Sequence, residues 1–149
     1  MPFHSKLDAI YIKMCHVWSS LSRAKRKKVG CLIVKNGSII SDGYNGTPKG
    51  FSNECEVRLD EHDPNALLTK PEVLHAESNA ITKLAKSTQS SDGATMYITV
   101  SPCIECAKLI IQSGISRVVY DEFYGNKEGI DLLHLAGITV LELTNSKSS

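Results

Sequence analysis

The chain has 149 residues, of which 42% are hydrophobic, and its net charge is +1 from 17 basic and 16 acidic residues. This composition predicts one domain over residues 1–149 and excludes a disordered or collagen-like chain. It provides no general electrostatic attraction for nucleic acid or for an anionic membrane. The N-terminus lacks the pattern of a secretory signal, and no apolar stretch is long enough to span a membrane. We therefore expect a cytoplasmic protein with neither of these partners.

The first half of the chain contains two regular patterns followed by an irregular segment. Apolar residues recur at helical spacing through residues 5–22, which predicts an amphipathic helix packed on an apolar surface. Residues 29–34 and 38–44 flank Asn36-Gly37, the strongest short hairpin signal in the chain. Residues 45–74 lose periodicity and gain Gly and Pro, and we expect a functional or mobile loop containing a short helix or two.

The second half alternates between helical and β-rich patterns. Helices are expected at 76–86, 103–113 and 127–136, and strands at 94–100, 116–120 and 138–143, followed by a polar, frayed tail over 144–149. Gly114 and Gly137 provide helix stops. Strands joined through helices favour an α/β domain, and we predict a three-layer α/β/α architecture around a mixed five-stranded sheet.

Two short motifs place metal-binding residue types at the start of helices. His75-Ala76-Glu77 opens the helix at 76–86, and Pro102-Cys103-Ile104-Glu105-Cys106 opens the helix at 103–113. Residues three apart lie on one side of a helix, so both cysteine sulfurs can face one ion, and the helix N-terminus favours thiolates. With His75 these cysteines make three ligands for Zn²⁺ and leave one position for water, which is typical of a catalytic site. Glu77 is then placed to act as the proton shuttle.

The cysteine pair by itself is also compatible with two other kinds of site. A thioredoxin-type redox pair is expected near the first strand-to-helix turn and needs no His-x-Glu partner. A closed structural zinc site requires a fourth ligand, for which Cys55 and His62 are the candidates. An odd number of five cysteines without a secretory signal argues against a disulfide framework.

The His-x-Glu and Pro-Cys-x-x-Cys motifs together form the signature of zinc deaminases. Four blocks of the chain resemble the deoxycytidylate (dCMP) deaminases, especially bacteriophage members, and the segment GYNGTPKG (43–50) distinguishes them from other zinc deaminases; the blocks are 29–53, 74–81, 93–124 and 136–143. The resemblance implies a cytidine-deaminase-like fold and zinc-dependent hydrolysis of dCMP to dUMP and ammonia, which feeds thymidylate synthesis, in the host cytoplasm if the chain is viral.

The resemblance also implies roles for individual residues. His75, Cys103 and Cys106 would bind catalytic zinc, with Glu77 as general acid and base. Asn45 would hydrogen-bond the sugar, and main-chain groups of Ala76 and Ser101 would contact the base. Tyr120, near the strand ends where ligands gather in α/β sheets, is a candidate to pack beside the nucleotide.

Assembly and regulation are further implications of the resemblance. Family members form homohexamers that dCTP with Mg²⁺ activates and dTTP inhibits, and Tyr44, Asn45 and Gly46 belong to the segment associated with the effector site. Some phage relatives hold a second, structural zinc through a cysteine in the segment that corresponds to RAKRKK (23–28). This chain has no cysteine there, although Cys55 with nearby acids or His62 could form such a site.

The segment RAKRKK (23–28) has five basic side chains in six residues. One interpretation is a solvated helix end whose cations suit the helix dipole. The other is a phosphate clamp, for which Arg26 is the main candidate and Arg23 a second one for substrate or effector phosphate. Arg117 and Lys49 are weaker candidates. The alternatives to dCMP deamination are a zinc deaminase for free cytidine, deoxycytidine or a nucleic-acid base, and a zinc-binding module without turnover.

Overall fold

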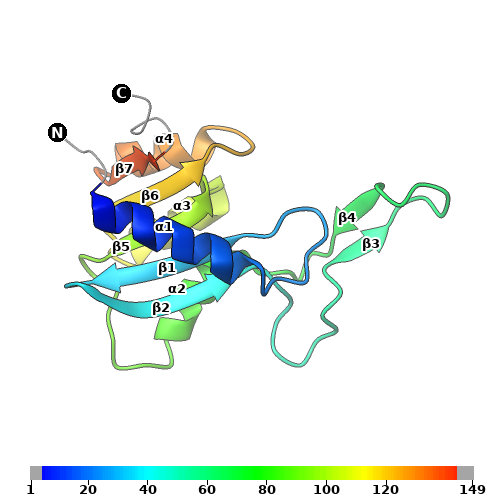
Figure 1. Cartoon of the computed structure of the whole chain (residues 1–149), viewed down its shortest axis with the longest axis horizontal. Helices are drawn as coiled ribbons and strands as arrows, with labels where there is room; N and C mark the ends of the chain where they lie inside the picture. Colours follow the sequence, from blue (N-terminus) through cyan, green and yellow to red (C-terminus); the bar gives the residue numbers. More distant parts are fainter. Residues whose placement is uncertain (1–4, 144–149) are drawn as a thin grey trace.

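A computed structural model describes residues 5–143 (Figure 1). In chain order its elements are α1 (Lys6–Ser19), β1 (Gly30–Lys35), β2 (Ser38–Tyr44), β3 (Glu56–Arg58), β4 (Leu67–Thr69), α2 (Ala76–Leu84), β5 (Thr95–Val100), α3 (Ile104–Gln112), β6 (Arg117–Glu122), α4 (Glu128–Leu135) and β7 (Thr139–Glu142). No helix in this range is long and apolar enough to cross a bilayer. The expected frayed tail lies outside the described residues.

The main sheet has five strands in the order β2-β1-β5-β6-β7. β1 pairs antiparallel with both β2 and β5, whereas β5, β6 and β7 are parallel. The β1–β2 turn places Asn36 and Gly37 at positive φ (51° and 76°), as the predicted Asn-Gly hairpin requires. The mixed five-stranded sheet and the order of helices and strands around it confirm the predicted fold class.

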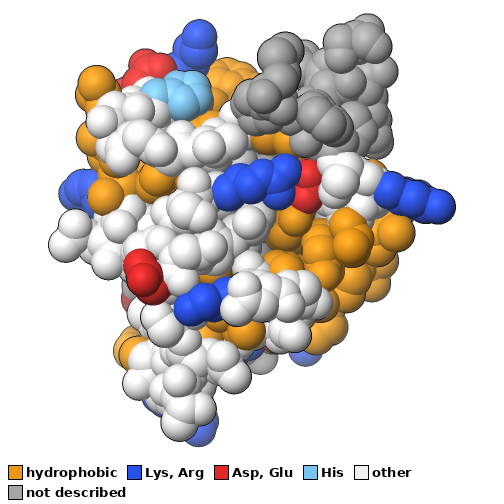
Figure 2. Space-filling model, turned by 90° about the vertical axis from the view of Figure 1, so that its left-hand side faces the viewer, with side chains coloured by type: hydrophobic (Ala, Val, Ile, Leu, Met, Phe, Trp, Pro, Cys, Tyr) orange, Lys and Arg blue, Asp and Glu red, His pale blue; other side chains and the backbone are white. Residues whose placement is uncertain are grey.

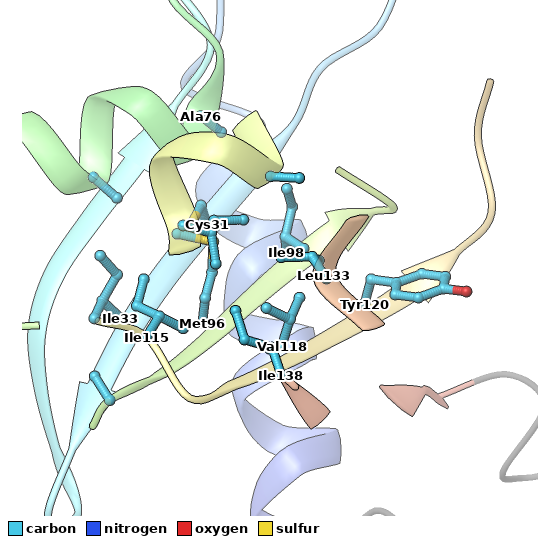
Figure 3. Close-up of a cluster of buried hydrophobic side chains, with 14 of the residues drawn as sticks. Cys31, Ile33, Ala76, Met96, Ile98, Ile115, Val118, Tyr120, Leu133 and Ile138 are labelled. Atoms are coloured by element: carbon cyan, nitrogen blue, oxygen red, sulfur yellow. The ribbon is translucent and has the colours of Figure 1, made fainter. Parts of the chain in front are cut away.

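Side chains alternate across the sheet and form two hydrophobic layers. Cys31, Ile33, Met96 and Ile98 point to the face covered by α2, α3 and α4 (Figure 3). Leu32, Val34 and Tyr97 point to the other face, where Ile12 and Cys15 of α1 cover them. Because strand side chains alternate with a period of two, both faces of β1 and β5 are buried.

α1 buries only part of the face that its hydrophobic spacing predicts. Cys15 of that face is buried, as expected, together with Asp8 and Ile12, whereas Leu7, Ile10, Met14 and Leu21 of the predicted apolar face are exposed. Asp8 can be buried because Arg117 Nη2 lies 2.5 Å from Asp8 Oδ2 and the Tyr97 hydroxyl donates to Asp8 Oδ1 at 2.5 Å. Both partners come from distant strands, so the helical pattern alone could not identify the buried face.

Residues 45–74 also differ from the prediction. In place of short helices, this segment contains the two-stranded antiparallel hairpin β3–β4, which extends away from the main sheet (Figure 1). The segment returns to the body through Gly46 and Leu74, whose main chains exchange hydrogen bonds of 3.0 and 2.8 Å. This bridge brings the end of β2 beside the start of α2.

Candidate active site

The predicted metal-binding residues meet at the N-termini of α2 and α3. His75 is the N-cap of α2, Cys103 is the N-cap of α3, and Cys106 lies in the first turn of α3. His75 Nδ1 is 3.3 Å from Cys106 Sγ and 3.5 Å from Cys103 Sγ, and the three ligand atoms lie within 4.8 Å of one another. Within residues 5–143 this is the one group of three or more such side chains arranged to hold an ion.

The electrostatics of these three side chains fit a divalent cation. Hydrogen bonds from Cys106 and then His75 lower the pKa of Cys103 to about 3 and so favour its thiolate. The hydrogen bond with Cys103, together with burial, raises the pKa of the Cys106 thiol, while the bond to Cys103 raises the pKa of His75. Two sulfurs sharing one site therefore cannot both ionise easily without a cation, and one imidazole with two thiolates is a typical zinc donor set.

Glu77 is a buried carboxyl group in the same site. It lies in the first turn of α2, only 4% exposed, and lines one cavity together with His75 and Cys103. Burial raises the pKa of Glu77 to about 7, and the opposing effects of its own backbone hydrogen bond and of His75 do not cancel this increase. A carboxyl group held in this way can accept and release a proton near neutral pH.

Two glycines allow the helices that carry the site to approach closely. A Cβ at Gly43 in β2 would lie 2.8 Å from the Ala80 nitrogen and closer still to the Ala76 carbonyl oxygen. A Cβ at Gly129 in α4 would lie 2.8 Å from the Cys103 carbonyl group and closer still to the Pro102 oxygen. Side chains are excluded at both positions, because the opposing atoms are backbone.

The cavity has a volume of about 340 Å³, within the usual range for small-molecule sites. It is lined by His75, Glu77 and Cys103 and by three segments that are distant from them in sequence. These segments are the basic run with Arg26 and Lys27, the β3–β4 hairpin with Glu56 and Thr69, and the loop after β6 with Tyr124 and Asn126. The cavity thus joins a candidate metal centre to a partly cationic wall.

Asn45 lines the cavity and also fixes its basic wall. Its side-chain carbonyl accepts the Val29 N–H at 2.9 Å, and its amide donates to the Lys27 carbonyl at 2.8 Å. Its own main-chain carbonyl accepts a hydrogen bond from Ser22 at 2.8 Å. The carbonyl oxygen and the NH2 group of the Asn45 side chain each retain one further hydrogen-bonding position. Asn45 therefore holds the backbone of Lys27 and Val29 and can still contact a sugar, and that contact stays a prediction.

Ala76 and Ser101 both line the cavity, as their predicted contacts with the base require. The Ser101 side chain has a separate use: its hydroxyl makes two hydrogen bonds with the main chain of Tyr124. The positions of Ala76 and Ser101 in the cavity agree with the predicted contacts. The contacts of their main chains with a base stay a prediction.

The basic candidates separate into different regions. Arg26 lines the cavity, where its main-chain N–H donates to Glu56 at 3.0 Å and its guanidinium to Thr69 at 3.2 Å. Arg23 lines a second, more polar hollow beside the β3–β4 hairpin. Arg117 pairs with Asp8 in the α1 layer and is therefore not a phosphate ligand at this cavity. Lys49 does not line it.

The position of Tyr120 contradicts its predicted place beside a nucleotide. Tyr120 is buried in the hydrophobic layer under α4, with its hydroxyl 3.4 Å from Glu142, and does not line the cavity. Tyr124 lines it instead, with Lys27 Nζ 5.4 Å from its ring centroid. Tyr124 follows the end of β6, whereas Tyr120 lies within the strand. A contact of either side chain with a nucleotide stays a prediction.

Two candidates for the effector site, Tyr44 and Gly46, lie outside the cavity. Tyr44 is exposed, and its carbonyl accepts a hydrogen bond from Asn79 at 2.8 Å. Gly46 forms the bridge to Leu74. Neither residue lines the cavity, which leaves their predicted role in an effector site untested. Cys55 is buried and, within residues 5–143, belongs to no group of three or more candidate metal ligands.

Residues 5–122 match the family described as the cytidine and deoxycytidylate deaminase zinc-binding region. The chain is 36% identical to deoxycytidylate deaminase of enterobacteria phage T4 over 168 aligned positions, which cover 89% of this chain and 87% of the phage protein. It is 38% identical to human deoxycytidylate deaminase, with 79% of this chain and 68% of the human protein covered.

A solved structure supports the same relationship. The crystal structure of dCMP deaminase from the cyanophage S-TIM5 in complex with dCMP and dUMP superposes with a TM-score of 0.84 at 42% identity, covering 93% of this chain and 98% of the cyanophage chain. The matched region contains both metal-binding motifs and Glu77. This chain therefore belongs to the cytidine and deoxycytidylate deaminase family.

Proposed function

We propose that the protein hydrolyses dCMP to dUMP and ammonia and so supplies dUMP for thymidylate synthesis. The observation that carries the proposal is one cavity that joins a buried carboxyl group, Glu77, to the His75, Cys103 and Cys106 group and to a basic wall. The relatives named above are deoxycytidylate deaminases, and the cyanophage enzyme was solved with dCMP and dUMP.

His75, Cys103 and Cys106 are the proposed zinc ligands. When bound by three such ligands, zinc supplies Lewis acidity and lowers the pKa of water toward neutrality. The Cys103 thiolate is already favoured by its neighbours, so this residue is prepared to bind a cation. The N-terminal positions of both helices add positive partial charge that stabilises the thiolates.

Glu77 moves the protons of the reaction. Its carboxylate takes one proton from the attacking water as oxygen bonds to C4 of the pyrimidine, and delivers that proton to the ring nitrogen N3. It then takes the second proton from the new C4 hydroxyl group and delivers it to the departing amino group. The C4–N bond breaks, ammonia leaves, and the C4 carbonyl of dUMP remains. Burial of Glu77 supports this role, because a carboxyl group with a raised pKa holds and releases a proton readily.

The cationic wall is the proposed site of the nucleotide phosphate. Arg26 and Lys27 line the same cavity as the metal-binding residues, and the remaining hydrogen-bonding positions of Asn45 are available for the sugar. The main chains of Ala76 and Ser101 are proposed to contact the base. Arg26 is the stronger phosphate candidate, because a guanidinium can donate to two oxygens at once.

Three alternatives are less well supported. A deaminase for a free nucleoside has no use for a basic wall, and one for a nucleic-acid base is disfavoured by a net charge of +1. A zinc-binding module without turnover has no use for a buried carboxyl group beside the ligands.

Homohexamer formation, activation by dCTP with Mg²⁺ and inhibition by dTTP are proposed from the resemblance around GYNG (43–46). Kinetics with each effector test this part directly. Sigmoidal dependence on dCMP that becomes hyperbolic with dCTP and Mg²⁺ supports the switch, and curves unchanged by either effector contradict it.

The main proposal is tested by release of dUMP or ammonia from dCMP, deoxycytidine and single-stranded DNA with the zinc-loaded protein. We expect dCMP to have the highest kcat/KM, and Arg26→Ala to raise KM for dCMP about tenfold while leaving the rate with deoxycytidine nearly unchanged. Lys49→Ala, a change of an exposed basic residue that does not line the cavity, is the matched control. Deoxycytidine turned over as efficiently as dCMP would contradict the proposed substrate.

A further inference from the structure

A stripe of five apolar side chains on α1 and the turn after it faces away from the sheet. Its members, called the α1 stripe below, are Leu7, Ile10, Met14, Val17 and Leu21, and each is between 40% and 72% exposed. They lie roughly 140° around the helix from the buried residues Ile12 and Cys15. In Figure 2 a hydrophobic area lies at the right-hand edge, on the side of the molecule where α1 covers the sheet in Figure 1.

The spacing of the α1 stripe is that of a helix–helix contact. Its members follow one another at intervals of three, four, three and four residues, which is the a/d pattern of paired helices. Leu21 continues the stripe because the chain makes further helical turns after α1, with the Leu21 N–H donating to the Trp18 carbonyl at 3.1 Å. Within residues 5–143 no helix covers this surface: α1 packs against strands β1, β2, β5 and β6 through its other face.

The order of side chains indicates which partner fits. From either end the α1 stripe reads leucine, β-branched residue, methionine, β-branched residue, leucine. A two-fold axis at Met14 sets Leu7 against Leu21 of a second copy and brings Ile10 within one residue of the second copy's Val17. Because residue i meets j while j meets i in a two-fold contact, this order sets leucine against leucine and β-branched residues close to β-branched residues on both halves of the contact.

The area and flanks of the α1 stripe also suit a two-fold contact. Five half-exposed apolar side chains present roughly 400 Å², whereas a stable interface buries ~800 Å² on each partner. The remainder is available from exposed polar residues along the stripe, among them Lys6, Lys13 and Ser20. An apolar centre with a polar rim is the usual anatomy of an interface.

We propose that the α1 stripe is a self-association surface, through which two copies of this chain pack α1 antiparallel about a two-fold axis at Met14. This proposal does not depend on the deamination site. Met14→Glu places two like charges at the axis, where they repel each other. We expect the dissociation constant of the contact to rise on the order of 100-fold. By sedimentation or light scattering, the mass of the particle should fall, to the monomer if the parent is a dimer and to a smaller assembly if the parent is larger.

The matched control is Leu135→Glu, which introduces the same charge at an apolar residue of α4 that is 86% exposed. It should leave the mass unchanged. Circular dichroism of both variants separates loss of association from loss of folding. If Met14→Glu unfolds the chain, the uncharged variant Met14→Ser should still weaken association relative to the wild type. A wild-type chain that is monomeric at all concentrations, or an assembly that neither Met14 variant alters, would overturn the proposal.

Cysteine cross-linking tests the axis itself. In the proposed packing, the new thiols of Met14→Cys in the two chains face each other across the two-fold axis. They should form a disulfide-linked dimer under mild oxidation. The control Val17→Cys sets the two new thiols about 9 Å apart along the helices, beyond the usual span of a disulfide. Peptide mapping identifies the bond against the native cysteines. Equal cross-linking of both variants, or a monomeric chain that instead sediments with anionic phospholipid vesicles, would contradict the two-fold contact.

Discussion

The Ser101 hydroxyl accepts a hydrogen bond from the Tyr124 N–H at 2.9 Å and donates one to the Tyr124 carbonyl at 3.1 Å. The Ser101 main chain adds a third link, because its N–H donates to the Glu122 carbonyl at 3.0 Å. One residue at the end of β5 therefore holds the loop that follows β6. This loop brings Tyr124 to the cavity wall, where Lys27 lies over its ring.

Removing the Ser101 hydroxyl should weaken substrate binding more than the chemical step. Ser101→Ala loses both hydrogen bonds to Tyr124 while keeping the backbone at the cavity, so we expect KM for dCMP to rise about tenfold with a smaller change in kcat. Ser113→Ala is the control, because that hydroxyl bonds to Ile110 at the end of α3. Steady-state kinetics would refute the expectation if kcat fell while KM stayed constant.

Glu77→Gln should remove turnover and keep zinc. The amide preserves the shape of the buried side chain but cannot carry the proton, and loss of general acid–base catalysis costs on the order of 10²–10⁴ in kcat. Zinc content, measured by atomic absorption, should equal that of the wild type. Glu105→Gln changes an exposed carboxylate between the two cysteines and should leave kcat unaffected. Turnover by Glu77→Gln within tenfold of the wild type would exclude Glu77 as the proton shuttle.

Gly129→Ala should disturb the metal centre through packing. The added Cβ would press on the backbone of Pro102 and Cys103, so α4 or the cysteine motif must shift. We expect the free energy of unfolding to fall by about 1–3 kcal/mol. We also expect a competing chelator to remove zinc at a lower concentration than it needs with the wild type. Leu135→Ala, on the exposed side of the same helix, should change neither quantity. Wild-type stability and zinc retention in Gly129→Ala would show that this close approach is not required.

Asp8 should make the stability of the fold dependent on pH in acid. Burial alone would raise its pKa, but hydrogen bonds from Arg117, Tyr97 and the Ser5 backbone outweigh this effect and lower the pKa from 3.8 to about 2. A lowered carboxyl pKa stabilises the folded state above 3.8, and this contribution is lost as the pH falls through about 2. The amount is about 2 kcal/mol.

Urea unfolding of the wild type and Asp8→Asn measures this effect. The advantage of the wild type should be full at neutral pH and should decrease as the pH falls from 3.8 toward about 2. Loss of zinc in acid affects both proteins alike and cancels in the difference. An advantage that stays constant through this range would show that Asp8 does not titrate with the lowered pKa.

The sequence alone was sufficient for most of the elements and for the metal-binding group. The Asn-Gly turn, the helix stops at Gly114 and Gly137, and the alternation of helices and strands depend on local backbone preferences, so they could be predicted without distant contacts. His75, Cys103 and Cys106 were identifiable because zinc chemistry restricts residue types and spacing. Their convergence followed from two motifs that both open helices.

Tertiary structure decided the features that depend on which distant segments meet. The burial of Asp8 requires Arg117 and Tyr97 from two other strands, and it determines which face of α1 packs on the sheet. The cavity wall includes Tyr124 because Ser101, directly after the neighbouring strand β5, holds its loop. Local sequence patterns record how apolar residues are spaced along an element. They do not record which charged group, strand end or second copy each face will meet, because those contacts join residues far apart in the chain.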